Sequence, residues 1–187
     1  MTQILVLYFS RHGKTRLLAR QIARGVETVE NCEAKLVTVA SFDDDTAPKD
    51  PIISKQDLNN CAGLAMGSPV WFGNMAAPLK HFWDQTSDIW VKGTLIDKPA
   101  CVFTSSSSLH GGQETNLQSM MLPLFHHGML VMGIPYSEPA LHATQSGGTP
   151  YGASAAGDSQ QLTPHESELA QRQGVRLAQA ALRLQDR

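Results

Sequence analysis

Short apolar runs alternate with helical patterns along this chain, and this alternation restricts its possible folds more than any other feature. Residues 3–9 (QILVLYF) are mostly aliphatic and aromatic, which predicts a strand buried on both faces. A helical pattern begins at about Lys14. Its apolar residues Leu18, Ile22 and Val26 recur every fourth position and therefore share one helix face.

Four more apolar runs predict further strands. They cover residues 34–39, 61–67, 99–104 and 129–134. The strand at 61–67 is expected to end before Ser68 and Pro69, because proline has no N–H to donate to a sheet ladder. The segments at 41–51 and 144–160 are rich in polar residues, glycine or proline, and we interpret them as loops.

Helices are predicted between these strands and after the last one. They cover residues 76–86, residues 113–125 and a final stretch that opens at Thr163. Thr163 suits the N-cap and Pro164 suits the first helical position. Glu166 stands three residues after the N-cap, as a capping box requires.

This alternation predicts an α/β fold, because a helix between two parallel strands covers a face of their sheet. Five strands fit a flavodoxin-like, doubly wound parallel sheet of order 2-1-3-4-5 with helices on both faces. A length of 187 residues is typical of one domain, and we assign residues 1–187 to a single flavodoxin-like domain.

Composition excludes several classes of function. A net charge of -2 does not favour nucleic-acid binding. No apolar run approaches the roughly 20 residues of a membrane helix, and the first residues do not resemble a signal peptide, so we expect a cytoplasmic protein without membrane insertion. The three cysteines are interpreted as reduced, buried thiols: Cys32, Cys61 and Cys101. No set of residues has metal-ligand spacing, so no metal site is predicted.

Three loops follow strands of the predicted sheet at the edge where ligands bind in doubly wound folds. In the first loop, residues 10–15, the hydroxyls of Ser10 and Thr15 and the free N–H groups of a helix start would form a phosphate cradle, and Gly13 permits close backbone approach. Taken alone, the loop equally fits an ordinary strand-to-helix turn. Its pattern matches neither a P-loop nor a Rossmann fingerprint.

The second loop, residues 67–75, places Trp71 and Phe72 between glycines, where a flat heteroaromatic ring would find stacking surface. The alternative is that both aromatic side chains pack onto the core. The third loop, residues 105–112, combines hydroxyls with small residues and otherwise fits a flexible polar linker. Because all three loops would line one cleft, their coincidence favours a ligand site.

The sequence resembles the WrbA (tryptophan-repressor-binding-protein) family, the FMN-dependent NAD(P)H:quinone oxidoreductases of flavodoxin-like fold. The resemblance rests on LVLYFSRHGKT, on residues 67–90, and on VFTSSSSLHGGQE, HHGM and GGTPYGA, which occur in the family's order over nearly the whole chain. It implies FMN as cofactor, NADH or NADPH as co-substrate, a homotetramer, and two-electron reduction of a quinone, for which we expect a ping-pong cycle.

The resemblance also implies roles for individual residues. The phosphate and ribityl chain of FMN would be held by Ser10, Arg11, His12, Gly13, Lys14 and Thr15. The flavin ring would be lined from the second loop by Ser68, Pro69, Val70, Trp71, Phe72 and Gly73. Its other side would be closed by Ser105, Ser106, Ser107, Ser108, Leu109, His110 and Gly111. His12 would lie near the nicotinamide nucleotide, His126 would act at the flavin, and Trp90 would form a wall of the quinone site from a neighbouring subunit.

Two departures from the family pattern and two rival functions are also part of the prediction. This chain has VWFGNM where the family usually has TRFGNM, so the second loop lacks an arginine near the flavin. Residues 41–57 form a shorter segment than in many relatives.

Two other functions compete with the quinone reductase. The first is a flavodoxin-type electron carrier, which usually has a strongly charged docking face. The second is a non-enzymatic binding protein without FMN affinity.

Overall fold

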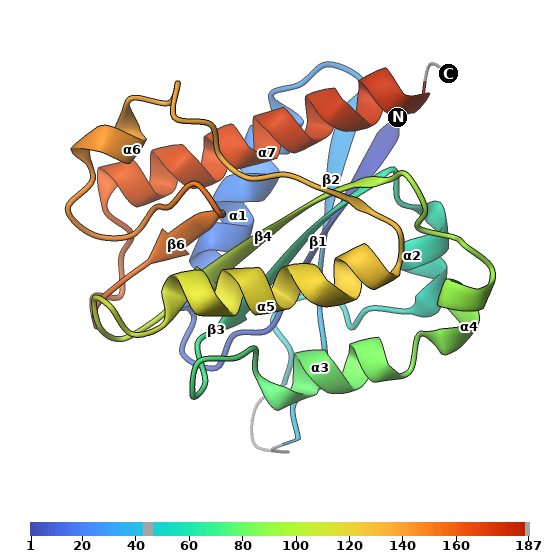
Figure 1. Cartoon of the computed structure of the whole chain (residues 1–187), viewed down its shortest axis with the longest axis horizontal. Coiled ribbons are helices and arrows are strands. Elements are labelled where there is room, and N and C mark those ends of the chain that lie inside the picture. Colours follow the sequence, from blue (N-terminus) through green and yellow to red (C-terminus); the bar gives the residue numbers. More distant parts are fainter. Residues whose placement is uncertain (43–46, 186–187) are drawn as a thin grey trace.

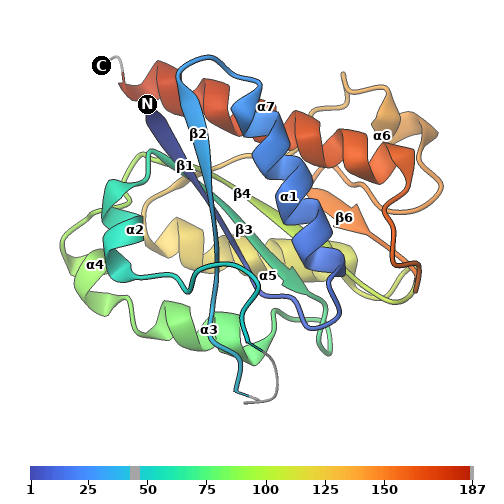
Figure 2. The same ribbon diagram turned by 180° about the vertical axis from the view of Figure 1, so that it is seen from behind.

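The computed structural model describes residues 1–42 and 47–185, and it forms one twisted sheet between two layers of helices (Figures 1 and 2). The strands are β1 (Thr2–Tyr8), β2 (Cys32–Thr38), β3 (Gly63–Pro69), β4 (Pro99–Ser105), β5 (Leu130–Val131) and β6 (Ala153–Ala155). The helices are α1 (Lys14–Glu27), α2 (Lys55–Asn60), α3 (Ala77–Asp84), α4 (Ser87–Val91), α5 (Gln113–His126), α6 (Ala140–Ala143) and α7 (Pro164–Gln185).

The sheet has the predicted order, β2-β1-β3-β4-β5, and all of its pairs are parallel. The predicted flavodoxin-like fold class is therefore confirmed. The predicted count of five strands is wrong, because β6 also pairs with β4. A strand was predicted over 129–134, but β5 has only two residues and pairs with the start of β4. The end of β4, at Phe103–Ser105, pairs with β6 instead.

The end of β3 also differs from the prediction, since the strand continues through Pro69. Proline is tolerated at this last position because the next ladder hydrogen bond comes from the following residue. The Val70 N–H donates to the Ser105 carbonyl over 2.8 Å. The loop predicted at 41–51 falls partly outside the described residues, at 43–46.

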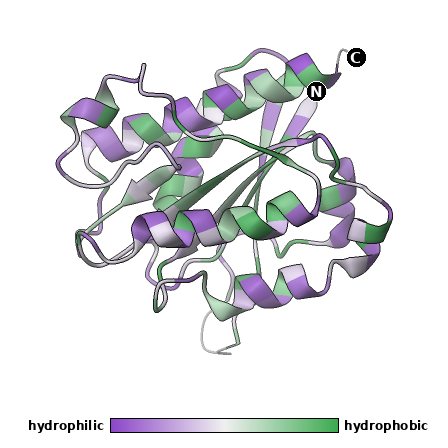
Figure 3. Cartoon of the chain, viewed as in Figure 1, coloured by the Kyte–Doolittle hydropathy of each residue, from purple (hydrophilic) through white to green (hydrophobic). Residues whose placement is uncertain are grey.

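Each face of the sheet carries its own apolar core, as alternation along β1 illustrates. Leu5 and Leu7 point to the side covered by α2, α3, α4 and α5, whereas Ile4 and Val6 point to the side covered by α1 and α7. Figure 3 shows the corresponding pattern of hydropathy, with hydrophobic central strands and helices that show both colours. Burial on both faces explains why the β1 sequence is a nearly continuous apolar run.

The predicted start of α7 is confirmed by its hydrogen bonds. The Thr163 N–H donates to Glu166 Oε2 over 2.9 Å, and the Glu166 N–H donates to Thr163 Oγ1 over 3.2 Å. These two bonds form the capping box that the sequence predicted. No helix in the described part of the chain is both long and apolar enough to cross a membrane.

Candidate functional site

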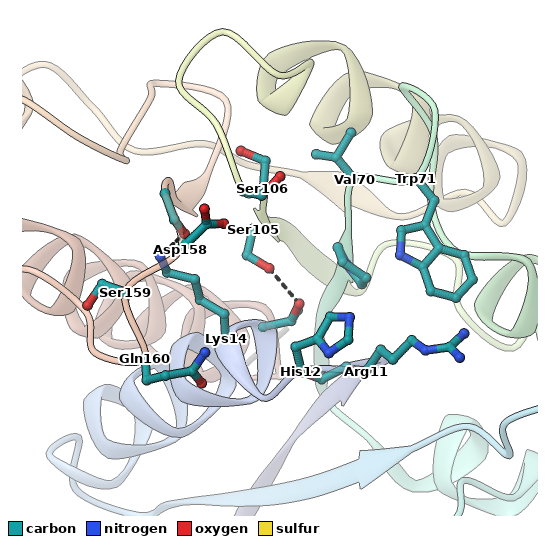
Figure 4. Close-up of a pocket in the computed structure, with 15 residues that line it drawn as sticks. Arg11, His12, Lys14, Val70, Trp71, Ser105, Ser106, Asp158, Ser159 and Gln160 are labelled. Atoms are coloured by element: carbon teal, nitrogen blue, oxygen red, sulfur yellow. Dashed lines mark hydrogen bonds between the residues drawn. The ribbon is translucent and has the colours of Figure 1, made fainter. Parts of the chain in front are cut away.

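A cavity of about 470 Å³ opens at the carboxyl ends of β1, β3 and β4 (Figure 4). Its volume lies within the roughly 300–1,000 Å³ typical of small-molecule sites. All three predicted loops contribute to its lining, and a fourth segment, residues 157–160, completes it. The lining residues are Ser10, Arg11, His12, Lys14, Thr15, Pro69, Val70, Trp71, Ser105, Ser106, Ser107, Gly157, Asp158, Ser159 and Gln160.

The first loop turns sharply into α1 and leaves backbone donors unpaired within the helix. Gly13 has φ +94°, a left-handed conformation that favours glycine, and its N–H donates to Ser10 Oγ over 3.1 Å. The helical hydrogen bonds begin with the Leu17 N–H, which donates to the Gly13 carbonyl over 3.0 Å. The N–H groups of the first helical turn therefore have no partner in the helix, and such a turn favours an anion.

Ser105, at the end of β4, joins all three loops. Its hydroxyl lies 2.8 Å from Thr15 Oγ1 in a buried contact, which links the third loop to the first. Its carbonyl accepts the hydrogen bond from Val70 described above, which links it to the second loop. The Val70 contact joins the ends of the neighbouring strands β3 and β4, and the Thr15 contact joins the start of α1 to the end of β4. The three loops are therefore held together at one edge of the sheet.

Trp71 forms the aromatic wall of the cavity. Its ring packs edge-on against Phe9, with ring centroids 5.5 Å apart. The Arg11 guanidinium lies 6.0 Å from the centroid of the Trp71 ring, within the range of a cation–π contact. The positive charge of Arg11, a residue of the first loop, therefore lies beside the second loop, which has no arginine of its own.

The fourth segment of the cavity lining, residues 157–160, forms a wall that was not predicted. Residues 157–160 belong to a polar segment that resembles a linker in composition, so no sequence signal set them apart. They are held against α1 by Lys14, whose Nζ donates to the Ala156 carbonyl over 3.0 Å and also to the Gly157 carbonyl. Lys14 therefore bonds to this segment in addition to lining the cavity.

The comparisons with known proteins agree with this geometry. Residues 2–138 match the model of the NADPH-dependent FMN reductase family. The chain belongs to this family. A relative from Chromohalobacter salexigens described as an NAD(P)H dehydrogenase (quinone) is 41% identical over 203 residues, which cover 98% of this chain and 99% of the relative.

Solved structures support the fold of this family member. A flavodoxin described as a WrbA-like protein, from Agrobacterium tumefaciens, has a TM-score of 0.76 at 24% identity, with 98% of this chain and 99% of that chain covered. A flavodoxin from the domain Archaea has a TM-score of 0.69 at 19% identity, with 97% and 99% covered. Together with the family match and the curated relative, these findings confirm the resemblance to the WrbA family.

Several residues predicted at the cofactor lie outside the cavity lining of this FMN reductase family member. They are Gly13, Ser68, Phe72, Gly73, Ser108, Leu109, His110 and Gly111. Ser68 is buried, and its Oγ accepts the Ala76 N–H over 2.8 Å. Phe72 is fully exposed at φ +50° on the tip of the second loop. Leu109 and His110 line a neighbouring cavity of about 350 Å³.

His126 and Trp90 lie together in another cavity, of about 410 Å³, between α3, α4 and α5. Neither residue lines the cavity at the strand ends. His126 is exposed, whereas His127 is buried and its Nε2 lies 2.9 Å from Thr86 Oγ1. Burial, and secondarily the charge of His126, lower the pKa of His127 from its usual 6.5. Because its pKa is lowered, His127 favours the neutral form.

No candidate metal centre is found among residues 1–42 and 47–185, where no three His, Cys, Asp or Glu side chains gather as a ligand set. The cysteines at 32, 61 and 101 are free and buried.

Proposed function

We propose that this chain is an FMN-dependent NAD(P)H:quinone oxidoreductase. The observation that carries the proposal is the cavity at the strand ends, which has an anion cradle at the start of α1 and an aromatic wall at Trp71. Those two features suit the phosphate and the ring of one flavin mononucleotide. The family match and the name of the relative from Chromohalobacter salexigens support the same reading.

The site's residues would hold FMN from three sides. The free N–H groups of the α1 start would bind the phosphate, together with the hydroxyls of Ser10 and Thr15. Val70 and Trp71 would line the ring, and Ser106 and Ser107 would close the cavity from the third loop. When bound, FMN supplies the two-electron chemistry between a nicotinamide nucleotide and a quinone, which no side chain here could perform.

The protein's own contribution to turnover would be placement and electrostatics. Arg11 would keep a positive charge at the mouth of the cavity, beside Trp71, where an anionic nucleotide enters. His12 lines the same cavity and would contact the nicotinamide nucleotide. We place the protein in the cytoplasm because its three free, buried cysteines suit a reducing compartment.

A visible-spectrum titration tests this function. The purified protein is titrated with FMN, reduced with NADH or NADPH, and then mixed with benzoquinone. We expect FMN binding, bleaching by the nucleotide and recovery of colour with the quinone. Steady-state double-reciprocal plots should be parallel, because nucleotide and quinone would use the same open side of the cavity in turn.

Other outcomes of the titration would reject the proposal in different ways. FMN binding without nucleotide-driven bleaching would favour a flavodoxin-type electron carrier, and absence of FMN binding would favour a binding protein that lacks the cofactor. Intersecting plots would reject the shared binding face while leaving the activity in place.

We further propose that His126 and Trp90 act at the flavin of a second copy within a homotetramer. They line a cavity of their own, so they serve the strand-end cavity only if another subunit brings them there. The surrounding surface carries large exposed apolar side chains: Trp90, Val91, Ile96, Leu122, Phe125 and Leu130. Patches of this kind mark protein interfaces. Phe72, fully exposed on the second loop, would supply a matching apolar contact from the other subunit.

Light scattering after size exclusion tests this assembly. Phe125→Asp should dissociate the tetramer and lower kcat/KM for benzoquinone by about tenfold or more, because a buried, unpaired charge destabilises an interface. The control is Tyr136→Asp, a similar change at an exposed aromatic outside the patch. A wild-type protein that is monomeric and fully active would contradict the proposal.

A further inference from the structure

The aromatic wall of the strand-end cavity is held in place by the core and by its own loop. The Trp71 ring is partly buried and packs against the core, with its centroid 5.5 Å from that of the buried Phe9 ring. The Trp71 N–H donates to the Asn74 carbonyl over 2.8 Å, and the Trp71 carbonyl accepts the Asn74 N–H over 3.0 Å. These two bonds close the tip of the second loop. The ring is therefore a fixed surface that can orient a neighbouring side chain.

Arg11 lies against this fixed surface. Its guanidinium carbon is 6.0 Å from the Trp71 ring centroid, and its exposed side chain lines the cavity. A guanidinium stays charged at physiological pH, and its planar head stacks on aromatic rings. Because the contact with Trp71 restrains a long side chain, less conformational entropy is lost when that side chain binds a ligand.

The charges of the cavity lining are separated along its length. Figure 4 shows Arg11 extending toward Trp71 at one end of the cavity and Asp158 at the other. Lys14 reaches toward the Asp158 end, where its Nζ donates to the backbone carbonyls at 156–157. Of the Asp, Glu, Lys and Arg residues in the described lining, Arg11 is thus the one at the Trp71 end. A ligand placed against Trp71 therefore meets a positive charge.

We propose that Arg11, oriented by Trp71, selects electron acceptors that carry a negative charge, such as quinones with a sulfonate or carboxylate group, over uncharged ones. The proposal rests on the proposed function, in which the acceptor takes the same open side of the cavity as the nucleotide and so lies beside Trp71. A guanidinium donates two parallel N–H bonds to a carboxylate or sulfonate, and an uncharged quinone offers no such partner. The same charge speeds the encounter with an anion.

A pair of redox-inert ligands tests this selection without a contribution from reduction potential. Naphthalenesulfonate and naphthalenesulfonamide have nearly the same shape, but only the sulfonate is charged at neutral pH. The oxidised, FMN-bound protein is titrated with each ligand, and the change in flavin absorbance reports Kd. We expect the sulfonate to bind at least about fivefold more tightly, as a bidentate ion pair at a partly exposed site would give. Equal Kd values would overturn the proposal. If the protein binds no FMN, the proposed function itself fails, which is a distinct result.

Two substitutions of Arg11 separate charge from side-chain shape. Arg11→Gln removes the charge and should lower the preference for the sulfonate about fivefold. Arg11→Lys keeps the charge without the planar head and should retain about half of the preference. Saturating FMN in every titration keeps a change in cofactor affinity out of the comparison. Equal losses in the two variants would overturn selection by charge.

Arg24→Gln is the matched control. It makes the same change in net charge at an exposed arginine on the last turn of α1, outside the cavity lining. We expect it to leave the preference unchanged. The proposal is overturned if Arg24→Gln lowers the preference as much as Arg11→Gln, or if an FMN-bound Arg11→Gln protein keeps the wild-type preference.

Reoxidation of the reduced protein extends the test to true acceptors. Protein reduced with NADH or NADPH is mixed in stopped flow with a naphthoquinone or with its sulfonate, and the two second-order rate constants are compared as a ratio. The intrinsic difference between the quinones is the same for every variant, so a change in the ratio reports the protein. We expect the sulfonate-to-neutral ratio to fall about threefold or more in Arg11→Gln, and to fall in the wild type as salt rises from about 0.02 to about 0.5 M. A ratio that is independent of salt and identical in both proteins would overturn the proposal.

Discussion

Gly13→Asp is expected to raise the Kd for FMN by about 100-fold without unfolding the protein. A Cβ at Gly13 would meet no protein atom within 4 Å, so the new side chain has space. The strain of φ +94° is moderate for aspartate, which tolerates left-handed conformations better than most residues. The added carboxylate would stand at the start of α1, where a phosphate would bind, and two like charges about 4 Å apart repel by roughly 1–4 kcal/mol.

Gly13→Asn is the matched control for this prediction. Asparagine has almost the same shape and the same tolerance of the backbone conformation, but it carries no charge. We expect it to weaken FMN binding about tenfold less than aspartate does. Thermal melts of both variants should lie close to the wild type. Equal FMN affinity in all three proteins would place the phosphate away from the first loop.

Gly67→Ala is expected to lower the free energy of unfolding by about 3 kcal/mol, at the upper end of the usual cost of overpacking. Gly67 in β3 pairs with Phe103 in β4, and a Cβ at Gly67 would lie 2.1 Å from Phe103 Cε2. Phe103 is fully buried, so its ring cannot move outward. Denaturant unfolding of the purified variant measures the loss.

A second substitution identifies the clash as the cause. Phe103→Leu shortens the opposing side chain and by itself should cost about 1–2 kcal/mol through lost burial. Combined with Gly67→Ala, it should be at least about 1 kcal/mol less destabilising than the sum of the single changes, since the two residues are in contact. Strict additivity would mean that Gly67→Ala acts elsewhere, for example through the strand backbone.

The cation–π contact at the cavity bears on the main departure from the WrbA pattern. Tryptophan at position 71 cannot replace an arginine as a donor. The structure nevertheless brings Arg11 to 6.0 Å from the Trp71 ring centroid. A positive charge therefore remains beside the second loop, although it comes from a different strand end.

Features that depend on nearby residues could be predicted from the sequence. The apolar run of β1 and the turn at Gly13 are local signals, and so is the capping box of Thr163 and Glu166, whose two partners stand three residues apart. The sheet order followed from the strand–helix alternation, because right-handed crossovers leave few arrangements of a doubly wound sheet. The same rule predicted that the first three loops meet at one edge.

The tertiary structure alone decided the rest. β6 is Ala-Ser-Ala, which carries no strand signal, and its place is fixed by pairing with β4. The segment at 157–160 follows Ala156, whose carbonyl accepts a hydrogen bond from Lys14, 142 residues earlier in the chain. His126 lies apart from the strand-end cavity because α5 places it there. Such contacts join segments that are distant in the chain, so their geometry depends on the packed core and not on the local sequence.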